Sequence, residues 1–180
     1  LVGIAPFLGQ DDLDRLVDQI PEGKVDCHVL PGLAPFLGGK TLSKLVDKAA
    51  DGTFDTGILP AIAPFLNEKD FNNIIDKAAS DKLDENLLIS LAPFISGRSF
   101  SRLIDKIADG NISPDIIVPL APFLGEDGIL KAIGKIPKDK LDTGIFTSLA
   151  PFLSGDALGR IIKNIAGREK LIGQANDTHE

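Results

Sequence analysis

Cys27 and His28 are the residues whose types most directly suggest chemistry, because a cysteine beside a histidine can be an activated nucleophile. They are adjacent, so in a first helical turn their side chains would point about 100° apart. Cys27 also occupies a repeat position held elsewhere by Thr56 and Glu85, and no acidic partner is indicated. We interpret the pair as structural. With His179 near the chain end, one Cys and two His make no convincing zinc site.

Two turn segments, 51–55 and 109–113, carry side-chain oxygens that could suggest calcium. Neither has the spaced ligands and terminal Glu of an EF-hand loop. A glycine that ends one helix and an N-cap that begins the next account for both segments. We therefore predict no metal site, no catalytic residue and no cofactor.

The overall charge excludes some partners. The 180 residues include 19 Lys+Arg and 26 Asp+Glu, a formal net charge of −7. A nucleic-acid binder needs a basic face, so no nucleic-acid partner is expected. No apolar run reaches the ~18–20 residues of a membrane span. The single Cys cannot form an internal disulfide. Together with the acidic balance, this favours a cytoplasmic location.

A tandem repeat organises the chain. The tripeptide Ala-Pro-Phe occurs six times at a constant interval of 29 residues, without insertion or deletion. The motifs begin at Ala5, Ala34, Ala63, Ala92, Ala121 and Ala150. This unbroken register indicates six units of one repeated structure. Positions in a unit are numbered from the Ala of its motif.

Each unit is predicted to begin with an amphipathic helix over positions 6–17, which is 39–50 in the second unit. Positions 9, 12, 13 and 16 are mostly apolar, as helical spacing requires. In the second unit they are Leu42, Leu45, Val46 and Ala49. Gly, Asn or Ser at position 5 suits the helix start, and glycine at position 19, as in Gly52, suits its end.

A second helix is predicted from position 23 to position 4 of the next unit. Asp55 is a good N-cap for it, and Phe54 and Leu59 form a hydrophobic staple around that cap. The segment is nearly all apolar, so it should be packed on most sides. The motif proline removes a backbone hydrogen bond, so we expect this helix to be short, bent or partly 3₁₀. The internal prolines disfavour a strand.

Together the elements predict an all-α protein, an α-solenoid or superhelix of six αα-hairpin units. One hairpin cannot bury its own apolar face, so stacked neighbours complete the core. We expect the motif Phe residues to belong to that core. A closed α-toroid is the alternative, because equal units give equal rotations. The repeat domain is predicted over 1–170, with 171–180 as a C-terminal cap or frayed tail.

Charged residues recur on one face of the first helix. Position 11 is mostly basic, position 15 is mostly Lys, and position 14 is Asp in the first four units. Position 14 then becomes Gly134 and Lys163. We interpret these rows as a solvated outer face with weak ion pairs, each ~0.2–0.5 kcal/mol.

These features resemble α-solenoid repeat proteins as a class. The 29-residue period is shorter than that of tetratricopeptide, ankyrin or HEAT units, whose marker residues are missing. The Leu/Ile-Ala-Pro-Phe-Leu motif followed by a capped amphipathic helix is similar to repeats of uncharacterised bacterial proteins. The resemblance covers residues 1 to about 167. It implies no known activity and no catalytic residue.

A candidate binding strip lies on the second helix, where positions 24, 27 and 28 vary and include small residues. The candidate residues are His28, Pro31, Asn86, Asp115 and Thr147. Such a strip suggests a groove for an extended peptide or a partner helix, although small residues also permit close helix packing. We therefore expect a non-enzymatic scaffold that binds a protein or peptide. The alternative is an assembly element, with self-association head to tail through uncapped repeat ends.

Overall fold

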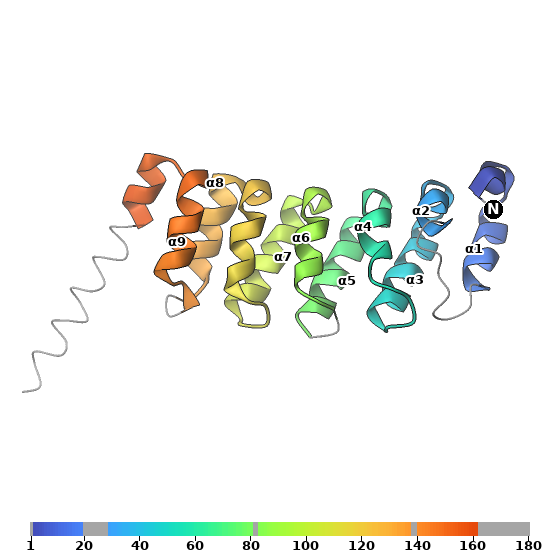
Figure 1. Ribbon diagram of the computed structural model, residues 1–180, viewed down its shortest axis with the longest axis horizontal. Helices are drawn as coiled ribbons and strands as arrows, with labels where there is room; N and C mark the ends of the chain where they lie inside the picture. Colours follow the sequence, from blue (N-terminus) through green and yellow to red (C-terminus); the bar gives the residue numbers. More distant parts are fainter. Residues whose placement is uncertain (1, 20–28, 81–82, 138–139, 162–180) are drawn as a thin grey trace, which may run out of the picture.

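The computed structural model describes residues 2–19, 29–80, 83–137 and 140–161. Every regular element in these ranges is a helix, which confirms the all-α class. The helices form two layers and follow one another in an open row (Figure 1). One end of the row holds η1 (Val2–Phe7) and α1 (Gln10–Asp18), and the other holds α9 (Thr143–Leu149) and η7 (Ala150–Phe152). The described residues therefore do not close into a ring.

The first helices of the units form one layer. They include α3 (Gly39–Ala50), α5 (Glu68–Ala78) and α7 (Gly97–Ala108), which match the predicted positions 6–17 to within a residue. Their apolar stripes are buried, with Leu45 and Ile74 both at 0% exposure. The end signal is also confirmed, because Gly52 and Gly110 have φ values of 77° and 81°. This left-handed backbone favours glycine.

The second helices form the other layer and are short. They include α2 (Val29–Leu33), α4 (Ile58–Ile62) and α6 (Asn86–Leu91). Each continues directly into a 3₁₀ turn made by Ala-Pro-Phe, namely η2 (Ala34–Phe36), η3 (Ala63–Phe65) and η4 (Ala92–Phe94). Proline has no N–H for the α-helical ladder, so the helix tightens and ends there. This confirms the prediction of a short, partly 3₁₀ helix.

The fourth and fifth units are joined differently. After η5 (Pro114–Ile116), α8 (Ile117–Lys135) runs through the second helix of the fourth unit and the first helix of the fifth. The two predicted helices are still distinct, because Gly125 interrupts the helix with φ 64° and ψ 174°. Glycine permits this backbone conformation without a Cβ clash.

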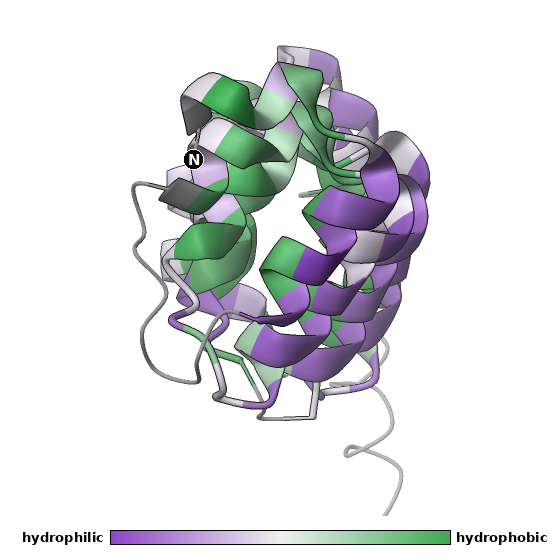
Figure 2. Cartoon of the chain, turned by 90° about the vertical axis from the view of Figure 1, so that its right-hand side faces the viewer, coloured by the Kyte–Doolittle hydropathy of each residue, from purple (hydrophilic) through white to green (hydrophobic). Residues whose placement is uncertain are grey.

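The core lies between the two layers. Leu59 and Leu88 of the second helices pack there at 0% exposure, together with the first-helix stripe. The motif Ala is buried as well, at 1% exposure from Ala5 to Ala121. Viewed along the row, the layer that carries the N-terminus is largely hydrophobic, and the opposite layer has a hydrophilic outer surface (Figure 2).

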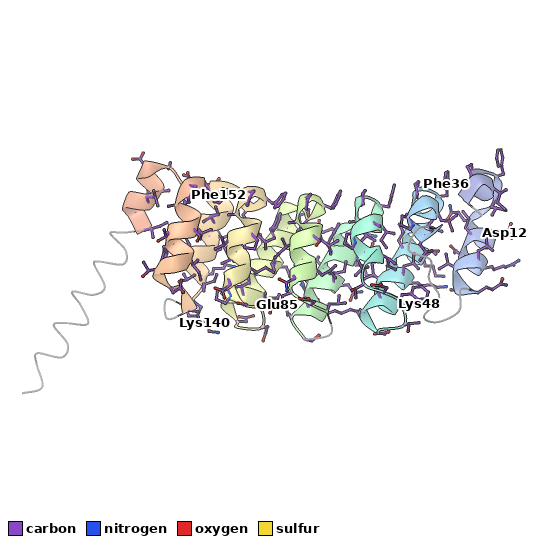
Figure 3. All side chains as sticks on the ribbon, in the orientation of Figure 1. Asp12, Phe36, Lys48, Glu85, Lys140 and Phe152 are labelled. Atoms are coloured by element: carbon purple, nitrogen blue, oxygen red, sulfur yellow. The ribbon has the colours of Figure 1, made fainter. Side chains whose placement is uncertain are left out.

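The expectation that the motif Phe belongs to the core is wrong for five of the six units, whereas Phe36 is half-buried and packs against the core. Phe65, Phe94 and Phe123 are 41%, 41% and 44% exposed. Phe152 is 39% exposed and Phe7 is 86% exposed. In a 3₁₀ turn of three residues per turn, Phe lies about 240° around the axis from the motif Ala. Because the Ala faces the core, the Phe is directed away from it. Phe36 and Phe152 are both seen along one edge of the row (Figure 3).

Candidate binding surface

The candidate strip on the second helices is accessible. Asn86 of α6, Asp115 of η5 and Thr147 of α9 are exposed, and Pro31 of α2 is half-buried. His28 lies outside the described residues, as do Cys27, His179 and the proposed cap at 171–180. Small residues on the strip, such as Ala61 and Ser90, are exposed too, so they do not serve close packing within the chain. Binding by the strip stays a prediction.

The strip ends at the motif Phe. Ser90 in α6 and Ala61 in α4 are exposed, and each is followed by an exposed motif ring, Phe94 or Phe65, across the 3₁₀ turn. The motif rings therefore add exposed apolar surface to the segments that carry the strip. The sequence analysis assigned these rings to the core. The signal that could have placed them outside is the preceding proline, which directly follows the buried Ala and converts the end of the helix into a 3₁₀ turn.

A cationic residue follows the motif Phe by four residues in each of the second, third and fourth units. Lys40, Lys69 and Arg98 occupy position 7 of the second, third and fourth units, and all three are exposed. Each is in the first turn of α3, α5 or α7, where the helix dipole disfavours positive charge. The first, fifth and sixth units have Asp at this position. Helix stability therefore does not explain the three central cations.

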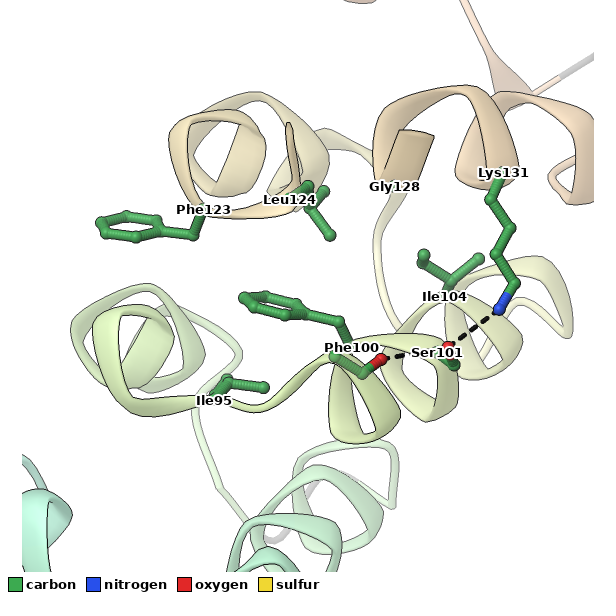
Figure 4. A pocket seen from close by; sticks show the side chains of 9 residues that line it. Ile95, Phe100, Ser101, Ile104, Phe123, Leu124, Gly128 and Lys131 are labelled. Carbon is green, nitrogen blue, oxygen red and sulfur yellow. Dashed lines mark hydrogen bonds between the residues drawn. The ribbon is translucent and has the colours of Figure 1, made fainter. Parts of the chain in front are cut away.

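A hollow of about 310 Å³ opens between α7 and α8. Phe100 and Ile104 of α7 line one side, and Phe123 and Leu124 of α8 line the other (Figure 4). Gly128 is at its wall, at the position that Thr41, Asp70 and Ser99 fill with buried side chains in other units. Leu124 packs directly against Gly128, where an added Cβ would lie 3.1 Å from the Leu124 Cβ. Its volume is at the lower end of the range for ligand pockets.

Polar contact is available at the rim of this hollow. Lys131 donates a hydrogen bond from Nζ to the Ser101 hydroxyl oxygen at 2.8 Å (Figure 4). Both residues are among those that line the hollow. The site thus combines two aromatic rings with one ammonium group. This combination suits an apolar or aromatic side chain that carries a nearby hydrogen-bond acceptor.

The charged face of the first helices is already internally paired. Lys44 in α3 contacts Asp18 in α1 at 3.0 Å, and Arg102 in α7 contacts Asp76 in α5 at 2.5 Å. The hydrogen bonds of both pairs span 26 residues. The predicted ion pairs are therefore present, but they join neighbouring units rather than turns of one helix. This face stabilises the row and offers few unpaired groups at those positions.

The class of protein defined by these observations is an all-α chain of paired helices. Scans of the sequence and structure against protein-family models, curated proteins and solved structures found no match. Within the described ranges, none of the helices combines the length and apolar character needed to cross a membrane. In the same part of the chain, no three His, Cys, Asp or Glu side chains come together as potential metal ligands.

Proposed function

We propose that this chain is a non-enzymatic α-solenoid of six 29-residue units that presents an extended surface for binding a protein or peptide. The observation that carries the proposal is the exposed strip on the second helices, which recurs from α2 to α9. On the other layer, charged groups such as Arg102 and Asp76 pair between neighbouring units.

The regular junctions support a preorganised surface. Lys44 with Asp18, Asn73 with Asp47 and Arg102 with Asp76 all form hydrogen bonds across 26 residues. Repeat arrays of this kind gain stability from the same nearest-neighbour contact at each step. A surface held in place before binding loses less conformational freedom when a partner docks.

A peptide-display experiment tests the proposal. A library of short random peptides is panned against the intact chain, and enriched peptides are measured by fluorescence anisotropy. The double variant Ala61→Arg/Ser90→Arg places two bulky charges on the exposed strip and should weaken binding by at least about tenfold. The matched control is Asp109→Arg/Asn111→Arg, at exposed positions of the turn between the two helices of the fourth unit.

Two results would contradict the proposal. In one, panning enriches no peptide that binds the chain in solution. In the other, the control variant weakens binding as much as the strip variant does. Circular dichroism of both variants would first show that their helix content equals that of the original chain.

The assembly role is the second candidate, and Leu16 favours it. Position 12 is buried at 0–1% exposure in Leu45, Ile74 and Leu103, but Leu16 of α1 is only half-buried. The N-terminal end of the row therefore leaves an apolar side chain partly uncovered. A partner unit stacked on this end would complete the packing.

The charges oppose stacking of two copies head to tail. In the register of the row, Arg15 at position 11 would meet position 14 of the sixth unit, which is Lys163 in the sequence. Light scattering during size-exclusion chromatography distinguishes the roles. A constant mass near 19.1 kDa over a wide concentration range favours the binding module. Growth of larger species that Leu16→Glu abolishes favours assembly.

A further inference from the structure

The motif rings form an apolar row that stays partly exposed at one edge of the chain. Each of Phe65, Phe94 and Phe123 exposes slightly more than 40% of its surface. For a phenylalanine side chain of ~200 Å², that is about 80 Å² per ring. An apolar patch of this extent, repeated unit after unit, is typical of an interaction surface.

The charge beside the row indicates the sign of the partner. Lys40, Lys69 and Arg98 follow Phe36, Phe65 and Phe94 by four residues in a chain whose net charge is −7. Arg98 forms an exposed ion pair with Glu68 at 3.9 Å, so these three cations stand beside one paired carboxylate. They leave this edge with an excess of positive charge. Complementarity favours an anionic partner there.

The spacing of the units indicates the partner's conformation. Neighbouring packed helices lie ~8–10 Å apart, so successive motif rings recur at about that interval. A polyproline II chain has three residues per turn and rises ~3.1 Å per residue, which is about 9 Å per turn. Every third side chain of such a peptide therefore points the same way, at about the spacing of the rings.

We infer that the row formed by Phe36, Phe65, Phe94 and Phe123, with Lys40, Lys69 and Arg98, binds an extended acidic peptide that has an apolar side chain at every third position. One apolar side chain contacts each ring, and the intervening carboxylates face the cations. The hollow between Phe100 and Phe123 receives the apolar side chain at one end of the peptide. This inference rests on the proposed function and names its ligand class.

A peptide fits these observations better than a lipid surface does. The rings are more than half buried, so they protrude too little to insert into a lipid surface. Only three cations accompany them, in an acidic chain. The hollow beside Phe123 has a volume of about 310 Å³, and the hydrogen-bonded Lys131 lies at its rim. Membrane association is therefore an alternative outcome of the test.

The probe is a fluorescently labelled peptide of sequence Leu-Asp-Pro-Leu-Asp-Pro-Leu-Asp-Pro-Leu, in which proline favours the extended conformation. One control peptide has the same composition with its leucines at intervals of two and four. A second control has Lys in place of Asp. Anisotropy should show that the probe binds at least about tenfold more tightly than either control. Equal binding of both acidic peptides would overturn the inference, because charge alone would explain it.

Variants locate the bound peptide. Lys40→Glu should weaken probe binding about threefold, and Lys40→Glu/Lys69→Glu/Arg98→Glu more than tenfold. Lys140→Glu is the matched control, because Lys140 is also exposed and lies at the edge opposite Phe36 and Phe152 (Figure 3). It should leave binding unchanged. The variant Phe65→Ser/Phe94→Ser removes two rings of the row, but it also changes partly buried residues. The charge variants change only exposed residues, so they test the site even if the double Phe variant does not fold.

The remaining outcomes separate the two proposals. If library peptides bind the strip but the probe does not bind, the inference is overturned and the proposed function stands. If neither the library peptides nor the probe binds the chain, the proposed function and the inference are both overturned. If the chain binds vesicles of phosphatidylserine and phosphatidylcholine but not the probe, the edge contacts a lipid surface and the inference is overturned.

Discussion

Ser43 in α3 donates its hydroxyl hydrogen to Oδ1 of Asp70 in α5 across 2.5 Å, which joins neighbouring units 27 residues apart. Asp70 is only 2% exposed, so this contact satisfies a buried carboxylate. Thr41 and Asp14 form the equivalent bond one unit earlier, also 27 residues apart. The next pair in this register is Ser99 and Asn72. Within the described part of the chain, the buried Oδ1 of Asn72 has no hydrogen-bond partner.

Alanine substitutions at position 10 of adjacent units should therefore have opposite effects. Ser43→Ala leaves the buried Asp70 short of a donor and should lower the free energy of unfolding by about 1–3 kcal/mol. Asn72→Ala removes an unsatisfied buried oxygen, so it should leave the free energy of unfolding unchanged or raise it by up to about 1 kcal/mol. Urea denaturation measures both. Equal losses in the two variants would contradict this account of the junction.

Gly134→Asp should extend the ladder of ion pairs by one step. Gly134 occupies position 14 in α8, and nothing lies within 4 Å of an added Cβ. Arg160 is exposed and follows Gly134 by 26 residues. The same separation joins Arg102 to Asp76. The new pair should raise the free energy of unfolding by up to about 0.5 kcal/mol, because Gly134 lies in the last turn of α8, where replacing a glycine gains little.

The charge effect at Gly134 needs its own control. Gly134→Asn changes helix propensity similarly but adds no charge. If Gly134→Asp stabilises the chain no more than Gly134→Asn in low salt, the ladder does not continue to Arg160. The difference between the two variants should also shrink in high salt, because exposed pairs are screened.

Phe94→Ala and Phe100→Ala compare an edge ring with a core ring in one unit. Phe100 is 8% exposed, so its loss should cost about 3–5 kcal/mol. Phe94 is 41% exposed, so its loss should cost about 1–2 kcal/mol. Denaturant unfolding of both variants gives the comparison. If Phe94→Ala and Phe100→Ala lower the free energy of unfolding equally, the motif ring packs as a core residue and this interpretation is wrong.

Asp76 predicts an acid dependence of stability. Burial raises the pKa of its carboxyl group, but the hydrogen bond and charge of Arg102, with help from Lys106, outweigh burial and lower the pKa below its ordinary value of 3.8. Asp76 also raises the pKa of Arg102. Because the folded-state pKa is the lower one, the pair stabilises the fold above the ordinary pKa. That stability is lost as the pH falls through the folded-state value.

Asp76→Asn should therefore cost up to about 1 kcal/mol near neutral pH and almost nothing near pH 2, since the pair is partly exposed. Urea denaturation at both pH values measures the change. A cost for Asp76→Asn that is the same at both pH values would show that the pair does not act through ionisation.

Much of the fold could be predicted because its signals are local. The stripe containing Leu45 and Ile74, the left-handed Gly52 and the capping carboxylate of Asp142 each depend on a few neighbouring residues. Asp142 accepts a hydrogen bond from the Ile145 N–H at 2.8 Å, as expected for a residue that begins the second helix, whereas α4 starts later than predicted, with Gly57 rather than Asp55 at its cap. Repetition over 29 residues made these weak signals mutually consistent.

The candidate surface was predictable only in part. Variation at Asn86 and Thr147 suggested residues outside the core, and both are exposed. Composition gave no such hint for Phe94, because an aromatic residue in an apolar run is usually buried. The sequence alone suggests no binding role for Lys40 and Arg98. That role is suggested by the structure, in which they follow motif rings at the surface.

By itself the sequence determined the helical class, the period and the inward stripes, because capping, helical spacing and glycine backbone angles act within one unit. The direction of the motif Phe and the partner of each charge were decided only by the tertiary structure. The 3₁₀ turn at Ala92–Phe94 rotates the ring away from the core. Stacking then brings Arg102 to Asp76 in the preceding unit, a contact that no single hairpin can make.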